Sequence, residues 1–227
     1  KYIDCVCDAN KAKHGKKFNS TCCIVGIDNL KKIPTAEYTI LVSPWAGIES
    51  AKYLEKAYGT KLLHYPTLPI GATETSKFLR TVAEFTGVDK DVVESVIREN
   101  EARFFYYLER YADTILESRI VSKRFTVVSE AQYVIAVAKF LVNDMGFFPE
   151  KLFVVDDTPE SFRASIETEL KNLNYGIQAD VEFSTDGHAI QDQIRQMDFA
   201  GTPLIIGSNW EKVLARDITA ALAMLKI

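Results

Sequence analysis

Histidine is scarce in this chain, and the motifs that most often give histidine or serine a catalytic role are missing. The 227 residues include three histidines, and there is no HExxH zinc motif, P-loop or GxSxG nucleophile elbow. These absences argue against zinc-protease, P-loop nucleotidase and serine-hydrolase chemistry. His64 alone lies beside a plausible cleft, where we expect a hydrogen-bonded structural histidine rather than a catalytic one.

The chain also lacks an excess of positive charge and a long hydrophobic run. Its 27 basic and 31 acidic residues give a formal net charge of -4, so a nucleic-acid partner is not expected. No apolar stretch approaches the length of a membrane span, and the first residues carry no apolar run typical of a signal peptide. We therefore expect a cytoplasmic protein that binds neither nucleic acid nor membrane.

The four cysteines lie in the first tenth of the chain and form no recognised metal motif. They are Cys5, Cys7, Cys22 and Cys23. The CxC and CC spacings differ from the paired CxxC of structural zinc sites, and vicinal cysteines rarely bridge one another. Because both pairs lie in strand-like segments, we expect buried free thiols. Iron–sulfur ligation is the alternative.

Strand and helix patterns alternate along the rest of the chain. Short segments rich in β-branched or aromatic residues indicate strands at 2–6, 23–27, 38–42, 61–64, 124–128, 152–155, 177–183 and 204–206. Apolar residues at helical spacing indicate helices at 47–58, 73–86, 130–145, 159–173, 187–197 and 210–217. This order predicts an α/β fold, with parallel sheets flanked by helices.

Residues 89–117 contain neither glycine nor proline and predict one long amphipathic helix. A helix of about 40 Å is longer than one small domain needs, so it is expected to connect two domains. We therefore predict an α/β domain over 1–88, a connecting helix over 89–119 and a second α/β domain over 120–227, both Rossmann-like. The aromatic run at 104–107 is expected to pack between domains rather than to bind a cofactor.

Residues 123–157 predict a strand, a helix and a second, parallel strand. The turn after the first strand reads Ser-Glu-Ala-Gln in place of GxGxxG, and its carboxylate would repel a phosphate, so nicotinamide and flavin cofactors are not expected. Asp156 and Asp157 end the second strand, at the edge where ligands of parallel sheets bind. We favour the alternative that they cap the helix starting at Pro159.

The most specific local pattern is the bend between the strand at 61–64 and the helix at 73–86, which reads HYPTLPIGATET. Two prolines and a glycine fix its backbone, and its threonines supply hydroxyl groups. A purely structural connection does not need so many polar residues. We therefore expect this bend to form one wall of a site.

Four separated blocks resemble the nitrogenase component 1 family, in the order and at the spacing of that family. They are SPWAGI from Ser43, the YPTLPIG bend, KRFTVV from Lys123 and PLIIGSNWEKVLARD ending at Asp217. The resemblance covers residues 36–220 and is closer to the β-type subunit than to the α type. The chain corresponds to part of such a subunit, and its last ten residues fall where the family has a strand.

The resemblance implies Rossmann-like α/β domains, a second component 1 subunit as partner and an ATP-dependent iron protein as electron donor. It also implies an iron–sulfur or related metal cluster held between domains in the full assembly. Ser43 stands where the α-type subunit has a cofactor-ligating cysteine, and a hydroxyl is a poor substitute for a thiolate on iron. No metal ligand and no cofactor are therefore expected on this chain alone.

The function implied by the resemblance is that of a nitrogenase-like oxidoreductase subunit in a hetero-oligomer. Residues expected to line its cleft, as cofactor-binding candidates, are Ser43, Tyr65, Thr67, Gly71, Thr73, Ser129 and Ser208. Two alternatives stay open: a non-catalytic scaffold on which a metal cofactor is assembled, and a module that binds a small molecule without metal. The motifs do not choose among dinitrogen, a tetrapyrrole or another compound as substrate.

Overall fold

The computed structural model describes residues 5–7, 17–18, 22–25, 33–117 and 123–225, and side chains within 33–111 and 123–225. Contacts divide the chain into two compact units. The first contains Lys1–Leu41 and Gly47–Leu63, and the second contains Val42–Ala46 and His64–Ile227. The division into domains at residues 88 and 119 stays a prediction.

The first unit contains a small sheet of three strands, β1 (Cys5–Cys7), β2 (Lys17–Phe18) and β3 (Cys22–Val25), in the order β1-β3-β2. Strands β1 and β3 are parallel, and the Cα of Cys5 is opposite that of Cys23. The side chains of all four cysteines lie outside the described residues. Whether their thiols are buried therefore stays a prediction.

A strand, a helix and a second strand follow: β4 (Tyr38–Val42), α1 (Ile48–Tyr58) and β5 (Lys61–Tyr65), with β4 paired to β5. Glycines with positive φ flank the helix, Gly47 at 85° and Gly59 at 71°. Such left-handed conformations are readily accessible to glycine, which is why α1 begins and ends at these positions.

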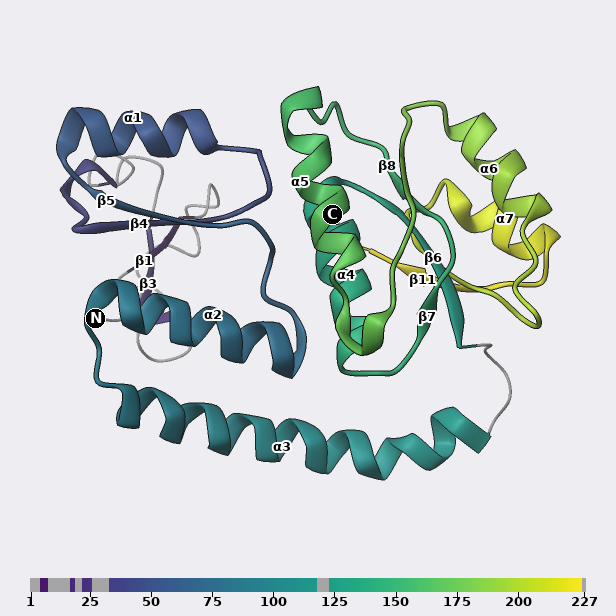
Figure 1. The fold of residues 1–227 in the computed structure, drawn as a ribbon, viewed down its shortest axis with the longest axis horizontal. Helices are drawn as coiled ribbons and strands as arrows, with labels where there is room; N and C mark the ends of the chain where they lie inside the picture. Colours follow the sequence, from purple (N-terminus) through teal and green to yellow (C-terminus); the bar gives the residue numbers. More distant parts are fainter. Residues whose placement is uncertain (1–4, 8–16, 19–21, 26–32, 118–122, 226–227) are drawn as a thin grey trace. The chain divides into compact units, whose positions relative to one another are not determined.

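The second unit contains a parallel sheet with helices on both faces (Figure 1). Its strands are β6 (Arg124–Ser129), β8 (Leu152–Val154), β9 (Val181–Phe183), β10 (Leu204–Gly207) and β11 (Ala221–Met224), and a short strand β7 (Phe148–Pro149) pairs with the start of β6. The helices are α4 (Ala131–Asn143), α5 (Glu160–Lys171), α6 (Gly187–Gln196) and α7 (Glu211–Asp217).

The strand order β11-β10-β6-β8-β9 shows where the winding of the sheet reverses. From β6 the chain moves outward through β8 to β9, and it then crosses to β10 on the other side of β6. All these pairs are parallel. The switch point therefore lies between the carboxyl ends of β6 and β10, which is where open α/β sheets bind ligands.

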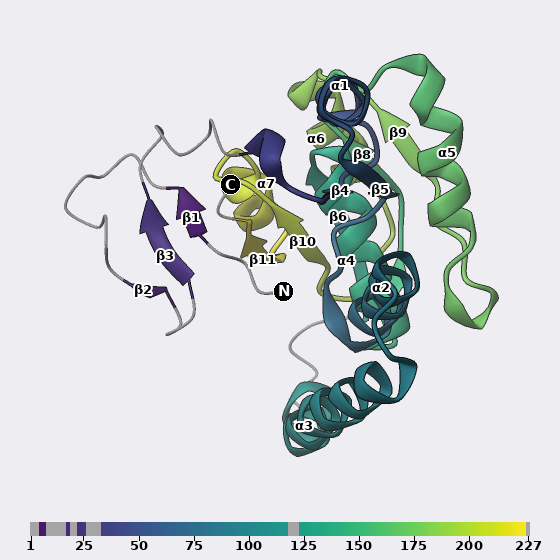
Figure 2. The same ribbon diagram turned by 90° about the vertical axis from the view of Figure 1, so that its left-hand side faces the viewer.

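Alternate residues of the central strands face two separate cores, as a period of two requires. Leu152 and Val154 of β8 pack with α4 and α5, whereas Phe153 between them packs with α6 and α7. In β10, Ile206 packs in the core with α4 and α5, and Ile205 packs in the core with α6 and α7. Figure 2 shows β10 and β11 beside α7. Because both faces are covered, these strands are hydrophobic without interruption, which explains their sequence pattern.

The structure confirms the predicted α/β fold with parallel sheets, and it corrects one strand. Residues 177–183 were expected to form a single strand, but only Val181–Phe183 do so. A turn of 3-10 helix at Asn174–Gly176 precedes it, with positive φ at Tyr175 and Gly176. Local β-propensity misses such a turn. The strand expected near the end of the chain is present as β11.

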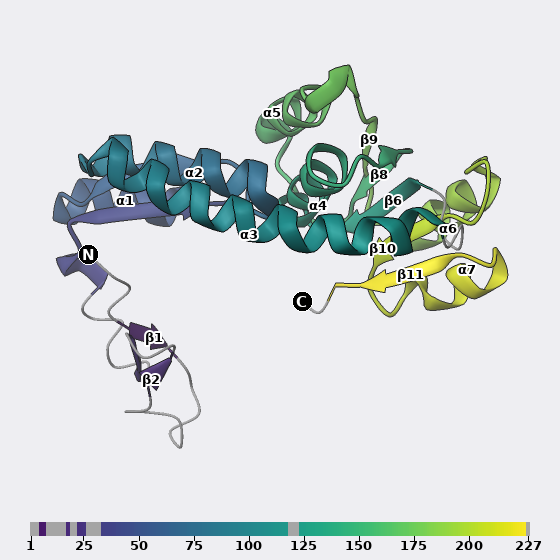
Figure 3. The same ribbon diagram turned by 90° about the horizontal axis from the view of Figure 1, so that it is seen from below.

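Helices α2 (Gly71–Thr86) and α3 (Lys90–Glu117) complete the second unit and lie side by side (Figures 1 and 3). The predicted long helix is therefore present. Of its aromatic run, Phe104 is half-buried, but Phe105, Tyr106 and Tyr107 are about half exposed. Phe104 lines a cavity with α2 inside the second unit, so the packing of this run between domains stays a prediction. Among the described helices, none has the length and apolarity to cross a membrane.

Asp144, just after α4, holds the start of α2. Its Oδ1 accepts hydrogen bonds from the backbone N of Thr73 at 3.1 Å and from the Thr73 hydroxyl at 2.6 Å. Its Oδ2 is buried and has no hydrogen-bond partner among the described residues. Burial raises the pKa of the Asp144 carboxyl above its ordinary value, although the bonds from Thr73 act in the opposite direction.

This raised pKa predicts how Asp144→Asn changes stability with pH. The folded protein holds the Asp144 proton more tightly than the unfolded chain does, so the contribution of Asp144 is most favourable below its unfolded pKa and is lost as the pH rises through its folded pKa. Asparagine cannot ionise and keeps an acceptor for Thr73. We expect the variant to gain stability relative to the wild type as the pH rises above about 4, the ordinary pKa of an aspartate, measured by urea unfolding. A pH-independent difference would contradict this account.

Candidate functional site

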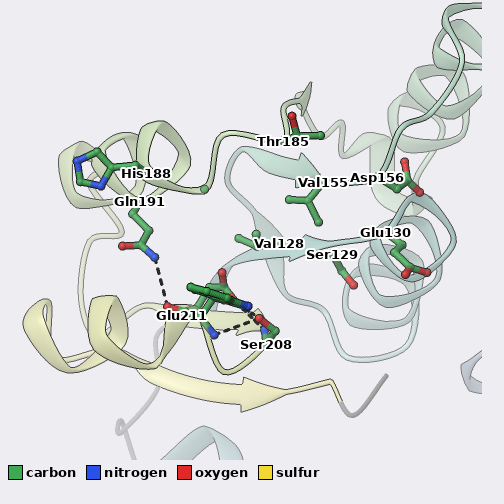
Figure 4. Close-up of a pocket in the computed structure, with 12 residues that line it drawn as sticks. Val128, Ser129, Glu130, Val155, Asp156, Thr185, His188, Gln191, Ser208 and Glu211 are labelled. Carbon is green, nitrogen blue, oxygen red and sulfur yellow. Dashed lines mark hydrogen bonds between the residues drawn. The ribbon is translucent and has the colours of Figure 1, made fainter.

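A cavity of the second unit lies at the carboxyl edge of its sheet, at the switch point between β6 and β10. We call it the edge cavity, and its volume is about 670 Å³. Figure 4 shows its walls, which come from the ends of β6, β8 and β10 and from the start of α6. The lining residues include Val128, Ser129, Glu130, Val155, Asp156, Thr185, His188, Gln191, Ser208, Trp210 and Glu211.

Ser208 and Glu211 are hydrogen-bonded to each other at the end of β10. The carboxylate of Glu211 accepts hydrogen bonds from the backbone N of Ser208 at 2.6 Å and from its hydroxyl at 2.9 Å. The Ser208 Oγ also accepts a bond from the backbone N of Trp210 at 3.1 Å. The S-x-x-E spacing is typical of such a contact. It is the sequence signal that could have identified Glu211, which was not among the predicted site residues.

Asp156 caps a different helix from the one expected. Its Oδ2 accepts a hydrogen bond from the backbone N of Ala131 at 2.9 Å, and its Oδ1 accepts one from the Thr158 hydroxyl. It therefore holds the start of α4, whereas Pro159, the N-cap of α5, makes no side-chain capping bond within the described residues. The prediction of a cap for the helix at 159 was wrong, because the ends of β6 and β8 are neighbours in the sheet although 25 residues apart in sequence.

The opposite wall belongs to α6. Asp186 accepts hydrogen bonds from the backbone N of His188 and of Ala189, so it caps this helix. From the second turn, Gln191 donates a hydrogen bond to the backbone O of Trp210 at 3.2 Å (Figure 4). This bond ties α6 to the loop after β10 and fixes the distance between the two sides of the cavity.

The edge cavity is acidic. Its lining contributes the carboxyl groups of Glu130, Asp156 and Glu211, and the described lining residues include no lysine or arginine. Asp156 and Glu211 receive hydrogen bonds from backbone N–H groups and hydroxyls, whereas Glu130 is contacted by the Gln132 amide at a long 3.5 Å. A phosphate would be repelled here, because no cation of the described lining compensates these charges.

Two buried hydroxyls without hydrogen-bond partners among the described residues line cavities that share Glu130. Ser129 is 3% exposed and lines the edge cavity. Ser43 is also buried, and it lines a smaller cavity of about 270 Å³ together with Trp45. Glu130 and Asp156 line both cavities. Buried polar groups without partners are uncommon, so each of these two hydroxyls calls for an explanation.

The other four predicted site residues lie away from the edge cavity, around the start of α2. Tyr65 is buried and donates a hydrogen bond to Glu74, and Thr73 binds Asp144. Thr67 is buried, and its hydroxyl has no partner among the described residues. Gly71 lines a third cavity of about 430 Å³ with α3. The structure thus brings Ser129 and Ser208 together at one cavity and places this second group elsewhere.

His64 has a structural hydrogen bond, as predicted. Its Nε2 lies 2.7 Å from the backbone O of Ser43. Because a carbonyl oxygen only accepts, Nε2 must carry the proton in this contact. His64 therefore holds the loop that presents Ser43.

The described residues do not offer a ligand set for a metal cluster. Among them, no group of three or more His, Cys, Asp and Glu side chains is placed to hold a metal ion. The buried hydroxyl of Ser43 is a hard oxygen ligand, whereas iron–sulfur clusters are held by thiolates. These residues do not fit such a cluster.

Removing the Asp156 carboxyl should destabilise the protein. In Asp156→Ala the Ala131 N–H at the start of α4 loses its acceptor, and we expect the free energy of unfolding to fall by about 1–2 kcal/mol. Asp156→Asn keeps an oxygen acceptor and should cost clearly less. Urea unfolding of the three proteins checks this, and equal losses in both variants would show that charge, not capping, is what matters at this position.

Comparison with known proteins identifies the family. Residues 14–227 match the family described as nitrogenase component 1 type oxidoreductase. In the light-independent protochlorophyllide reductase of Bradyrhizobium sp. (strain ORS 278), the subunit designated B is 29% identical over 119 residues, which are 52% of this chain and 21% of that protein. The corresponding subunit of Acidiphilium rubrum is 30% identical over 121 residues, 52% of this chain and 22% of that protein.

A solved structure, Nitrogenase Cp1 at pH 6.5, has the same fold. It superposes on 92% of this chain with a TM-score of 0.63 at 18% identity, and the match covers 43% of that chain. The chain spans about a fifth of the length of the curated relatives it matches. From the match over residues 14–227, we conclude that the chain belongs to the nitrogenase component 1 type oxidoreductase family.

Proposed function

We propose that this chain is part of a component 1 subunit of a nitrogenase-like oxidoreductase. In this proposal, an ATP-dependent iron protein supplies electrons, and an iron–sulfur or related metal cluster is held together with a second component 1 subunit. The family match over residues 14–227 is the observation that carries the proposal. The similarity to B subunits of light-independent protochlorophyllide reductases also supports it.

The cluster ligands must then come from elsewhere than the described side chains, which include no suitable group. Sources consistent with this are the partner subunit and side chains that the structure does not describe, including those of the four cysteines. The role proposed for the described residues is to shape the cleft. Ser43, Ser129 and Ser208 would line it, while Tyr65, Thr67, Gly71 and Thr73 would fix α2 behind it. The proposed domains remain 1–88 and 120–227, joined by 89–119.

Anaerobic purification with the partner subunit and the iron protein tests this function. We expect the complex to contain iron and sulfide, to show an electron paramagnetic resonance signal, and to change that signal when the iron protein and ATP are added. A complex without iron after reconstitution would refute the proposal. Transfer of the cluster to an acceptor protein, without redox change, would instead identify a scaffold for cofactor assembly.

Two variants locate the ligands. Ser43→Ala should keep the iron content of the complex, since its hydroxyl is not proposed to bind the cluster. Replacing Cys5, Cys7, Cys22 and Cys23 together by serine asks whether these thiols are ligands. Loss of iron would assign the cluster to this chain, and retained iron would assign it to the partner or to other segments.

A further inference from the structure

We propose that the edge cavity binds a flat organic cation, of the kind formed by an amidinium or guanidinium group on an aromatic ring, with the Glu130 carboxylate as its anchor. This site goes beyond the proposed function, because it requires neither a metal cluster nor an iron protein. The site lies at the switch point of the sheet, and its residues follow the ends of β6 and β10.

The first argument is the distribution of charge. Asp156 and Glu211 line the cavity, but their carboxylates already accept hydrogen bonds from the backbone of Ala131 and Ser208. Glu130, by contrast, makes a long contact to Gln132. The described lining residues include no lysine or arginine that could pair with the Glu130 carboxylate. A ligand with positive charge and N–H donors would supply this pairing. A planar amidinium can give a carboxylate two parallel hydrogen bonds.

The second argument is the hydroxyl of Ser129, next to Glu130 (Figure 4), which has no partner among the described residues. A side chain that is 3% exposed has little access to water, so leaving its hydroxyl unpaired is unfavourable. The hydroxyl can accept a hydrogen bond from a bound donor. Ser129 and Glu130 are consecutive residues of the cavity lining, and we assign the Ser129 hydroxyl as a second acceptor for a ligand that carries more than one N–H group.

The third argument concerns the shape of the ligand. Val128 and Val155 supply apolar surface inside the cavity, and Trp210 in its wall is 82% exposed. The backbone of Trp210 is held by bonds from Gln191 and to Ser208, so its ring is presented from a fixed loop. An exposed indole attracts flat cations. A volume of about 670 Å³ lies within the range of small-molecule sites.

The two tryptophans of the chain allow a direct test, because both lie in cavities that include Glu130. Trp210 lines the edge cavity, and Trp45 lines the smaller one. In Trp45→Phe, fluorescence reports on Trp210 alone. We would titrate this variant, without metal, with 4-aminobenzamidine as the cationic probe, 4-aminobenzamide as its neutral analogue and 4-aminobenzoate as its anionic analogue, and confirm binding by calorimetry.

We expect saturable quenching by the cation, binding at least about tenfold weaker for the neutral amide, and no saturation with the anion. In the Trp45→Phe background, Glu130→Gln should weaken the cation about tenfold, and Ser129→Ala should weaken it several-fold. Glu99→Gln removes an exposed carboxylate of α3 and should leave binding unchanged. Thermal unfolding verifies that each variant is folded.

Equal affinities for the three probes would overturn the proposal, as would full binding by Glu130→Gln or the absence of binding to the cation at millimolar concentration. Tighter binding of the anion would reverse the charge assignment and overturn it too. The proposed oxidoreductase function would be untouched by any of these results, because the titration involves neither iron nor the partner proteins.

Discussion

Lys139→Met should lower the free energy of unfolding by about 3–5 kcal/mol, because it leaves a buried carboxylate without its cation. Lys139 of α4 and Glu74 of α2 have side chains only 5% exposed, and their charged groups lie 3.3 Å apart. Lys139 also contacts the more exposed Glu169, at 2.6 Å. Methionine fills a similar volume, so the loss measures the uncompensated charge rather than a void. Urea unfolding near neutral pH gives the change.

The control for this loss is Glu74→Gln, alone and together with Lys139→Met. In the double variant no charge remains buried at this pair, so it should be more stable than Lys139→Met alone. Lys52→Met removes a cation from the exposed pair with Glu49 and should have little effect. If adding Glu74→Gln to Lys139→Met lowers the stability further, the unpaired carboxylate is not the cause of the loss.

Tyr65 contacts the same buried group, the carboxylate of Glu74, and this contact indicates its role. Its hydroxyl donates a hydrogen bond to Glu74 at 3.2 Å in a buried position. Burial and the charge of Glu74 raise the pKa of the Tyr65 phenol far above its ordinary range. Tyr65 therefore stays protonated at neutral pH and serves as a donor within the network. It positions α2 rather than exchanging protons with a ligand.

The alternation of strand and helix patterns was enough to predict the α/β fold, because a buried parallel strand and an amphipathic helix each leave a local pattern. The same patterns placed Ser129, Asp156 and Ser208 at strand ends. The structure brings them together at one cavity because the carboxyl ends of parallel strands lie at the same edge of a sheet.

The contacts made by the bend before α2 could not be predicted from the sequence. Thr73 meets Asp144 and Glu74 meets Lys139, and these pairs are separated by 71 and 65 residues.

Gly71→Ala adds a single methyl group in the bend before α2. It should lower the free energy of unfolding by roughly 2–5 kcal/mol. Gly71 has φ at +83°, where a side chain costs about 1–2 kcal/mol. A Cβ there would also lie 2.0 Å from Asp144 Oδ2 and 2.6 Å from Phe140 Cδ2, which adds an overpacking cost of about 1–3 kcal/mol. Chemical unfolding of the variant checks the sum.

Gly87→Ala separates the two causes. Gly87 ends α2 with a similar φ of +72°, but a Cβ there would meet no described residue within 4 Å, so only the backbone cost of about 1–2 kcal/mol is expected. The excess loss in Gly71→Ala then measures how closely α2 is held against α4. Equal losses in the two variants would mean that the start of α2 can move away from Asp144. The residue pattern of the bend before α2 would then have to be explained by a ligand rather than by packing.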